Sequence, residues 1–211
     1  MIDSLKQLLH AITDVQGIVT GGGTVLVCAI IFVETGLFLG FFLPGDSLLV
    51  TAGVFAGTGH MNLGALLIFG ALCAILGDQL GYAIGHRAGK TLYSRPDSRF
   101  FKKKHLERTQ AFYDKHGPKT IVMARFVPIV RTFAPAVAGA AAMNYRKFVT
   151  YNIAGGLLWV WSMTLLGYFL GAHIPNIDRN IHYVIVVVII LSILPPVIEI
   201  MRERRKAAPP A

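Results

Sequence analysis

The hydrophobic and polar positions of the chain divide it into long apolar stretches separated by charged segments. Three of these stretches are long enough to cross a membrane, because a spanning helix needs about 20 apolar residues. They predict transmembrane helices over 63–86, 148–171 and 181–201. The first of them contains one charged residue, Asp78, and the last is followed by a basic tail over 202–211.

Two further apolar stretches, 24–57 and 120–143, contain charged residues beside helix-breaking prolines. In the second, only 14 residues separate Arg131 from Arg146, which is about 21 Å of helix against a membrane core of about 30 Å. A straight span there would leave an arginine in lipid, whereas a hairpin that enters and leaves on one side is surrounded by protein. Both stretches are therefore predicted to be re-entrant hairpins. The residues predicted to break them, or to allow close approach of the backbone, are Pro44, Gly45, Pro128, Pro135 and Gly139.

The charged segments predict the orientation of the chain. Residues 87–119 carry ten Lys and Arg against three acids, so the positive-inside rule places this basic segment and the C-terminal tail in the cytoplasm. The helix over 63–86 then runs inward and the helix over 148–171 runs outward. The first hairpin opens to the outside and the second to the cytoplasm. Residues 1–20 have hydrophobic positions at helical spacing, which predicts an amphipathic helix on the membrane surface, on a side that the pattern leaves open.

A weak internal repeat indicates two inverted halves. A shift of 86 residues aligns the LGYxxG sequence at 80–85 with the one at 166–171, and it also aligns small residues of the two hairpins. Inverted repeats with broken helices are an architecture of transporters. The predicted fold class is an all-α polytopic membrane protein with a single membrane domain over 1–211. It is an inverted repeat of two re-entrant helical hairpins, each followed by a transmembrane helix, with a C-terminal transmembrane helix and an N-terminal amphipathic helix.

Composition agrees with a membrane protein and excludes several functions. The chain is 54% hydrophobic and only 15% charged, with a mean hydropathy of +0.58, whereas soluble domains carry about 25% charged residues. The net charge of +9 comes from loops and the tail, so nucleic acid is not an expected partner. The histidines and cysteines form no metal-binding motif, and no hydrolase, P-loop or dinucleotide-binding motif occurs. We expect neither a metal nor another cofactor, and no enzymatic activity.

Two arginines form the first part of a candidate site. Arg125 and Arg131 flank Pro128, and a guanidinium group stays protonated and matches phosphate geometry with two hydrogen bonds. On an unbroken helix six residues would turn them about 240° apart, so they converge only if the helix breaks at the proline. The alternative is that each arginine reaches the headgroups or forms a structural ion pair. We interpret the pair as a binding site for the phosphate of a substrate.

Three acids complete the candidate site. Glu34 interrupts an apolar stretch, where burial favours the neutral carboxylic acid and a nearby arginine favours the carboxylate. This predicts that Glu34 exchanges a proton, although a structural pair with an arginine is equally well supported. Asp46 follows Pro44 and Gly45, where it could cap a half-helix, take part in proton coupling, or do both. Asp78 is left open between ion pairing and a secondary role in the site.

At these motifs the chain resembles the DedA family of bacterial inner-membrane proteins, within the broader group that shares the SNARE-associated (VTT) domain. The resemblance covers roughly 20–205. It rests on Glu34 with FLPGDS at 42–47, on ARFVPIVRTFAPAVAG at 124–139 and on FYDKHG at 112–117. The arginine motif with its proline spacing is the specific part.

The resemblance implies re-entrant hairpins, an inverted repeat and movement of lipids across the cytoplasmic membrane in dependence on the proton gradient. Undecaprenyl phosphate and phosphatidylethanolamine are the lipids associated with the family. Carried over by position, the essential acids of the family fall on Glu34 and Asp46. Its essential arginines fall on Arg125 and Arg131.

The expected function is therefore a lipid transporter or flippase of the bacterial inner membrane, with membrane lipids and protons as partners. The arginines would hold the phosphate and the acids would exchange protons. One alternative is a proton-coupled antiporter of ions or small cations. Another is an assembly factor that transports nothing, in which the charged pairs only brace the fold. The pattern leaves open which lipid is carried and which oligomeric state the protein adopts.

Overall fold

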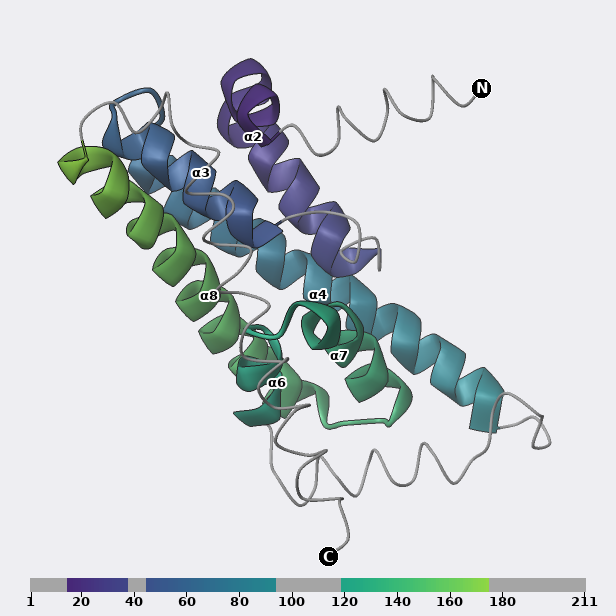
Figure 1. The fold of residues 1–211 in the computed structure, drawn as a ribbon. Coiled ribbons are helices and arrows are strands. Elements are labelled where there is room, and N and C mark those ends of the chain that lie inside the picture. The colour runs from purple at the N-terminus through teal and green to yellow at the C-terminus, as the bar shows by residue number, and fades with distance from the viewer. Residues whose placement is uncertain (1–14, 38–44, 94–118, 175–211) are drawn as a thin grey trace, which may run out of the picture.

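The computed structural model describes residues 15–37, 45–93 and 119–174, and all regular elements within them are helices. The predicted span over 181–201 lies outside the described residues, as do 1–14, 38–44, most of the basic segment and the C-terminal tail. Figure 1 shows the arrangement, in which two long helices run in opposite directions and the shorter ones pack against them. The elements are α2 (Val15–Gly36), α3 (Gly45–Gly57), α4 (Leu63–Tyr93), α6 (Lys119–Ala124), α7 (Pro128–Ala140) and α8 (Tyr145–His173).

The two long helices lie where hydrophobic patterning predicts spans. Within α4 the stretch Leu63–Gly89 is long and apolar enough to cross a membrane, and all of α8 is as well. Both helices start with the same local signal, because Asn62 and Asn144 each accept a hydrogen bond from a backbone N–H three residues later. This capping sets the start of each helix at the short turn that follows a hairpin.

The segment predicted as the first hairpin begins after a kink. Gly23 has φ of +54°, in the left-handed region that suits glycine, and it separates the start of α2 from the apolar part that precedes Glu34. The kink falls where the sequence predicts the change from surface helix to hairpin. The chain then passes through residues outside the described part, including Pro44, and α3 starts at Gly45.

The segment predicted as the second hairpin breaks at one proline and not at the other. Turn residues separate α6 from α7, and Pro128 occupies the first turn of α7, where its missing N–H costs nothing. The prediction that Pro135 is a second break is wrong, because α7 continues through it to Ala140. A proline inside a helix removes one backbone hydrogen bond, and its ring crowds the carbonyl four residues before it. Here α7 is packed closely along α4, with Pro135 against Gly81, and this packing keeps the helix intact.

The second helix of each predicted hairpin packs against the long helix of the other half. Helix α3 lies along α8 and α7 lies along α4, with glycines where the backbones meet. A Cβ atom on Gly167 would overlap the backbone of Val50, and one on Gly85 would overlap the backbone of Ala136. Gly139, predicted to allow close approach, does so inside α7 against the backbone of α4 and does not interrupt the helix.

The packing changes the register of the internal repeat. Val50 and Ala136 are separated by 86 residues, as the sequence repeat predicts, but the glycines that contact them, Gly167 and Gly85, are separated by 82. The capping asparagines are also 82 residues apart. The long helices are thus equivalent in packing at a spacing one helical turn away from the LGYxxG match. That match reflects small residues recurring every turn and not structural equivalence.

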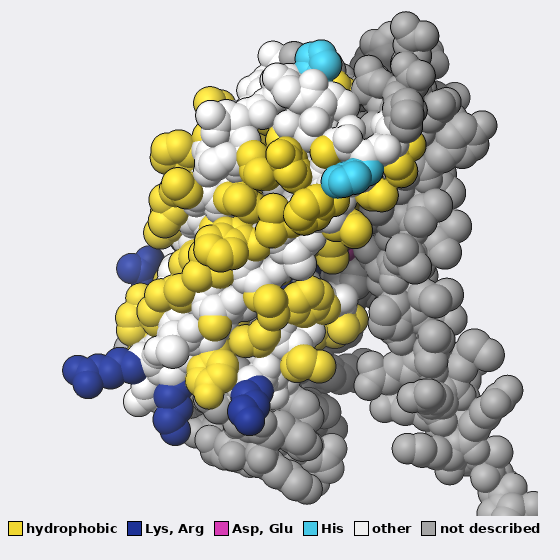
Figure 2. Space-filling view, turned by 90° about the vertical axis from the view of Figure 1, so that its left-hand side faces the viewer, with side chains coloured by type: hydrophobic (Ala, Val, Ile, Leu, Met, Phe, Trp, Pro, Cys, Tyr) yellow, Lys and Arg dark blue, Asp and Glu magenta, His cyan; other side chains and the backbone are white. Residues whose placement is uncertain are grey.

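The outside of the bundle is apolar in its middle. Figure 2 shows hydrophobic side chains spread across one face, with Lys and Arg side chains gathered toward its lower edge. The exposed large hydrophobic residues of the two long helices include Phe69, Leu72, Leu76, Leu158, Trp161, Leu166 and Phe169. Such an extensive exposed apolar surface fits a lipid environment.

Candidate functional site

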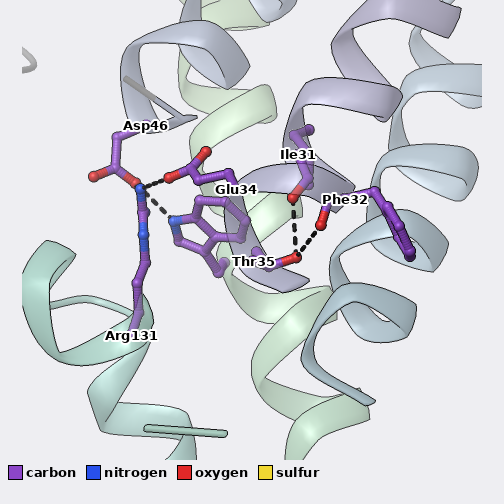
Figure 3. A network of polar contacts seen from close by, with 7 residues as sticks. Ile31, Phe32, Glu34, Thr35, Asp46 and Arg131 are labelled. Atoms are coloured by element: carbon purple, nitrogen blue, oxygen red, sulfur yellow. Dashed lines mark hydrogen bonds and ion pairs between the residues drawn. The ribbon is translucent and has the colours of Figure 1, made fainter. Parts of the chain in front are cut away.

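Arg131 of α7 joins the two hairpins through ion pairs. Its Nη1 atom donates to Oδ1 of Asp46 at 2.5 Å, and its Nη2 atom donates to Oε1 of Glu34. Glu34 comes from the last turn of α2 and Asp46 from the first turn of α3. Figure 3 shows the three side chains pointing toward one another. The turn before α7, the end of α2 and the start of α3 therefore bring these charges together.

Trp159 of α8 adds a third side to this cluster. Its indole N–H donates to Oδ1 of Asp46 at 2.8 Å, and its ring lies 4.6 Å from the guanidinium carbon of Arg131. Stacking of a guanidinium on an indole is favourable, and more so away from water. Trp159 was not among the residues predicted for the site. The missed signal was that an indole in mid-helix, far from a membrane interface, needs a buried acceptor.

Arg125 forms a second, separate network. Its Nη2 atom donates to Oδ2 of Asp78 in α4 at 2.5 Å and also to Oδ1 of Asn152 in α8. The Nδ2 atom of Asn152 donates to the backbone oxygen of Ile75 at 3.1 Å. Asn152 is fully buried and was not singled out from the sequence, because a single asparagine in an apolar helix carries no motif.

The local sequence provides room for both networks. Any side chain at Gly45 would overlap the carboxylate of Glu34, so this position needs glycine for the acid to sit against α3. Gly155 and Gly156 play the same part for Arg125, since a Cβ on Gly155 would lie 3.1 Å from the Cδ atom of Arg125. Near Glu34, the hydroxyl of Thr35 donates to the backbone oxygen of Ile31, as Figure 3 also shows.

The charges of the site are buried and unequal in number. Glu34, Asp78 and Arg125 are at most 3% exposed and Arg131 is 7% exposed. The acidic residues in the described ranges 15–37, 45–93 and 119–174 are Glu34, Asp46 and Asp78. Each of them is paired with Arg125 or Arg131. Three carboxylates face two guanidinium groups, so one negative charge is in excess when all are ionised. Leaving a charge buried without a partner is costly.

Some hydrogen-bonding atoms of the site have no protein partner. In the part of the chain that the structure describes, the Nε atoms of Arg125 and Arg131 are buried and lack an acceptor. The Oε2 atom of Glu34 is also buried there and lacks a donor. Buried polar atoms in proteins are normally satisfied, and exceptions call for an explanation. Two unused donors on two cations fit a ligand rich in acceptor oxygens.

The predicted site residues are thus brought together in two groups. The acids Glu34 and Asp46 both pair with Arg131, whereas Asp78 pairs with Arg125. Asp46 lies in the first turn of α3 and bonds side chains from two other helices. No cluster of three or more His, Cys, Asp or Glu that could hold a metal occurs within the described residues.

Comparison with known proteins places the chain among membrane proteins of one family. Residues 43–169 match the model of the VTT domain. Protein DedA of Escherichia coli is 50% identical over 85% of this chain and 82% of its own length. The uncharacterized membrane protein Rv0364 of Mycobacterium tuberculosis is 42% identical over 86% of this chain and 81% of its own length.

A more distant relative covers less of the chain. Inner membrane protein YqjA of Escherichia coli is 36% identical over 67% of this chain and 64% of its own length. No solved structure matches the chain. The family match over more than half of the chain and the identity to DedA agree with the apolar helices of the fold: the chain is a membrane protein of the DedA family, with a VTT domain.

Proposed function

We propose that this protein moves a phosphate-bearing lipid across the bacterial inner membrane and that protons drive the movement. The observation that carries the proposal is the pair of buried arginines, each with an Nε donor that no group of the described residues accepts. A phosphate offers several acceptor oxygens and a charge that balances a guanidinium. The exposed apolar surface of the long helices leaves room for the acyl or prenyl chain to stay in lipid.

The excess of acids supplies a way to couple protons to binding. Arg131 holds two carboxylates, so an incoming phosphate must compete with Glu34 and Asp46 for the same guanidinium. Protonation of one acid would remove the excess negative charge and weaken its hold on Arg131. The phosphate then binds as a proton is taken up, and loss of the proton on the other side returns the acid to the arginine and releases the phosphate. No covalent bond changes, so the proposed role is that of a carrier and not of an enzyme.

The membrane topology forms part of the proposal. Both broken segments are taken as re-entrant hairpins that meet at mid-membrane, with the basic ends of the bundle in the cytoplasm. The relative YqjA is named an inner membrane protein. The distribution of Lys and Arg along this chain predicts that its basic ends lie on the cytoplasmic side of such a membrane. Broken helices that present charged groups at mid-membrane are used by secondary transporters to bind ions and anionic groups.

The proposal is tested by transport in proteoliposomes of purified full-length protein. Labelled undecaprenyl phosphate, labelled phosphatidylethanolamine and a labelled neutral diacylglycerol are offered separately, each with and without an imposed pH gradient. We expect a phosphate-bearing lipid to move faster than in empty liposomes, with acceleration by the gradient, and diacylglycerol to move at the background rate. Equal rates with and without protein for every phosphate lipid would refute the proposal.

The acid excess also fits a second candidate, an antiporter that exchanges protons for a small cation. In that case Oε2 of Glu34, which has no partner among the described side chains, would face the cation. The same proteoliposomes distinguish the two functions, because cation flux without lipid movement would identify the antiporter. Two guanidinium N–H groups without an acceptor among the described residues favour an anionic ligand over a cation, so lipid transport is the primary proposal.

A further inference from the structure

The two arginines of the site are held in different ways. Arg131 bonds its two carboxylates through separate terminal nitrogens, whereas Arg125 bonds Asp78 and Asn152 through one nitrogen, Nη2. One acid balances Arg125, so that pair is neutral without any proton. A phosphate that bonds Arg125 through its other donors, on Nε or Nη1, need not replace either of these two partners.

Asn152 is itself fixed. Its Nδ2 atom donates to the backbone oxygen of Ile75, which leaves Oδ1 facing Arg125. The two glycines that follow on α8, Gly155 and Gly156, lie against the guanidinium, where Cβ atoms would come within 3.1 to 3.5 Å of Arg125 atoms. Asn152 and this glycine pair form a slot that determines which edge of the guanidinium is bonded and which is not.

The donors of Arg125 that Asp78 and Asn152 leave unused are the ones that could bond a phosphate. The Nε atom of Arg125 is buried and has no acceptor within the described residues. Because Asp78 and Asn152 take the two hydrogens of Nη2, phosphate oxygens can bond Arg125 only through its other donors, on Nε and Nη1. The direction of these donors matters as much as the charge. If Nη2 is held in place on one side, the Nε side is aimed in a fixed direction.

We propose that Asp78 and Asn152 are positioning residues for Arg125, with opposite effects on how tightly it binds a phosphate. This inference rests on the proposed function. Asn152 aims the guanidinium and so strengthens binding. Asp78 offsets the charge of Arg125 and so weakens binding, which lets the phosphate leave. Neither residue carries the coupled proton.

The experiment measures binding of dodecyl phosphate to the full-length protein in phosphatidylcholine nanodiscs, together with lipid transport in proteoliposomes. Asp78→Asn keeps an acceptor oxygen for Arg125 but removes its countercharge. We expect binding about threefold tighter or more, slower turnover and a pH profile like that of the wild type, since a nearby charge changes affinity for an anion. Asn152→Leu keeps the side-chain volume but frees the guanidinium. We expect binding about tenfold weaker, as for the loss of one oriented hydrogen bond to a charged group.

Thr164→Val is the matched control, because Thr164 is fully buried on the same helix as Asn152 and its hydroxyl has no partner in the described part of the chain. It should bind and transport like the wild type. A shifted pH profile in Asp78→Asn would assign the coupled proton to Asp78 and overturn the inference, as would unchanged binding in either variant. If Asp78→Asn does not fold, Asn152→Leu alone decides. Absence of dodecyl phosphate binding in the wild type would refute the proposed function and this inference with it.

Discussion

At the scale of single residues, the site depends on how each guanidinium is shared. Arg131 contacts an acid from each half-helix of the first hairpin and the ring of Trp159 from α8. A lysine has no planar fork and cannot reproduce these contacts. The number and direction of the donors at this position therefore matter as much as the charge.

The first prediction concerns this geometry. Arg131→Lys should reduce lipid transport nearly as much as Arg131→Ala, because one ammonium cannot bond both Glu34 and Asp46 in the same geometry. Arg131→Ala should also destabilise the fold by about 3–5 kcal/mol, since it leaves buried acids without a partner. Transport rates and thermal unfolding in detergent measure the two effects separately. Full transport by a folded Lys variant would show that positive charge alone is sufficient.

The second prediction tests the proton at Glu34. Glu34→Gln keeps the shape of the side chain and an oxygen that can accept from Arg131, and it removes both the titration and the excess negative charge. Because the remaining acids and arginines then balance, the variant should fold and bind phosphate but lose acceleration by a pH gradient. Transport at several imposed gradients provides the measurement. If a folded Gln variant still responds to the gradient, the proton is carried elsewhere, with Asp46 the next residue to test.

At the scale of elements, glycines determine how the hairpin helices lie on the long helices. In α4, successive glycines one turn apart have different neighbours. Gly77 faces the side chain of Thr35 in α2, Gly85 and Gly89 face the backbone of α7, and Gly81 lies between them with only ordinary contacts. The spacing of one turn lets a single helix present backbone to two partners.

The third prediction uses two of these glycines as a matched pair. Gly85→Ala places a methyl group onto the backbone of Ala136 and should destabilise the protein by about 1–3 kcal/mol. Gly81→Ala, one turn away, meets only the Cβ atom of Pro135 at 3.4 Å and should be neutral or slightly stabilising, because alanine favours a helix. Melting temperatures of the purified variants measure the two changes in stability. Equal losses in both variants would mean that helix propensity and not packing determines the effect.

At the scale of the whole molecule, the two ends of the bundle have different surfaces. The turn between α3 and α4 exposes His60, and the start of α8 exposes Arg146 and Lys147. Basic residues beside spans are retained in the cytoplasm. The bundle should therefore have the start of α8 inside and the α3–α4 turn outside.

The fourth prediction tests this orientation. In a variant without Cys28 and Cys73, a cysteine at Lys147 should react with an impermeant maleimide only in inside-out vesicles, and a cysteine at His60 only in intact spheroplasts. Both positions are exposed in the structure, so unequal labelling reports the side of the membrane. Labelling of His60→Cys from the inside would reverse the topology and the direction assigned to each hairpin.

The sequence by itself determined the elements whose causes are local. The spans α4 and α8 follow from runs of apolar residues, and the break at Pro128 follows from a residue with a special backbone preference. The residue types also indicated the charged groups of the site, because charges in apolar segments are exceptional. Pro135 shows the limit of local rules, since packing on α4 holds a helix that a proline alone would weaken.

Only the tertiary structure decided which charges pair. Glu34 and Arg131 are 97 residues apart, and Asp78 and Arg125 are 47 apart. The sequence predicted one site with two converging arginines, whereas the packing of α7 on α4 and of α3 on α8 assigns each arginine its own acids. Asn152 and Trp159 join the site for the same reason. An ion pair depends on the distance between atoms on different helices, and that distance is set by the close contact of backbones at glycines, which no pattern along one helix contains.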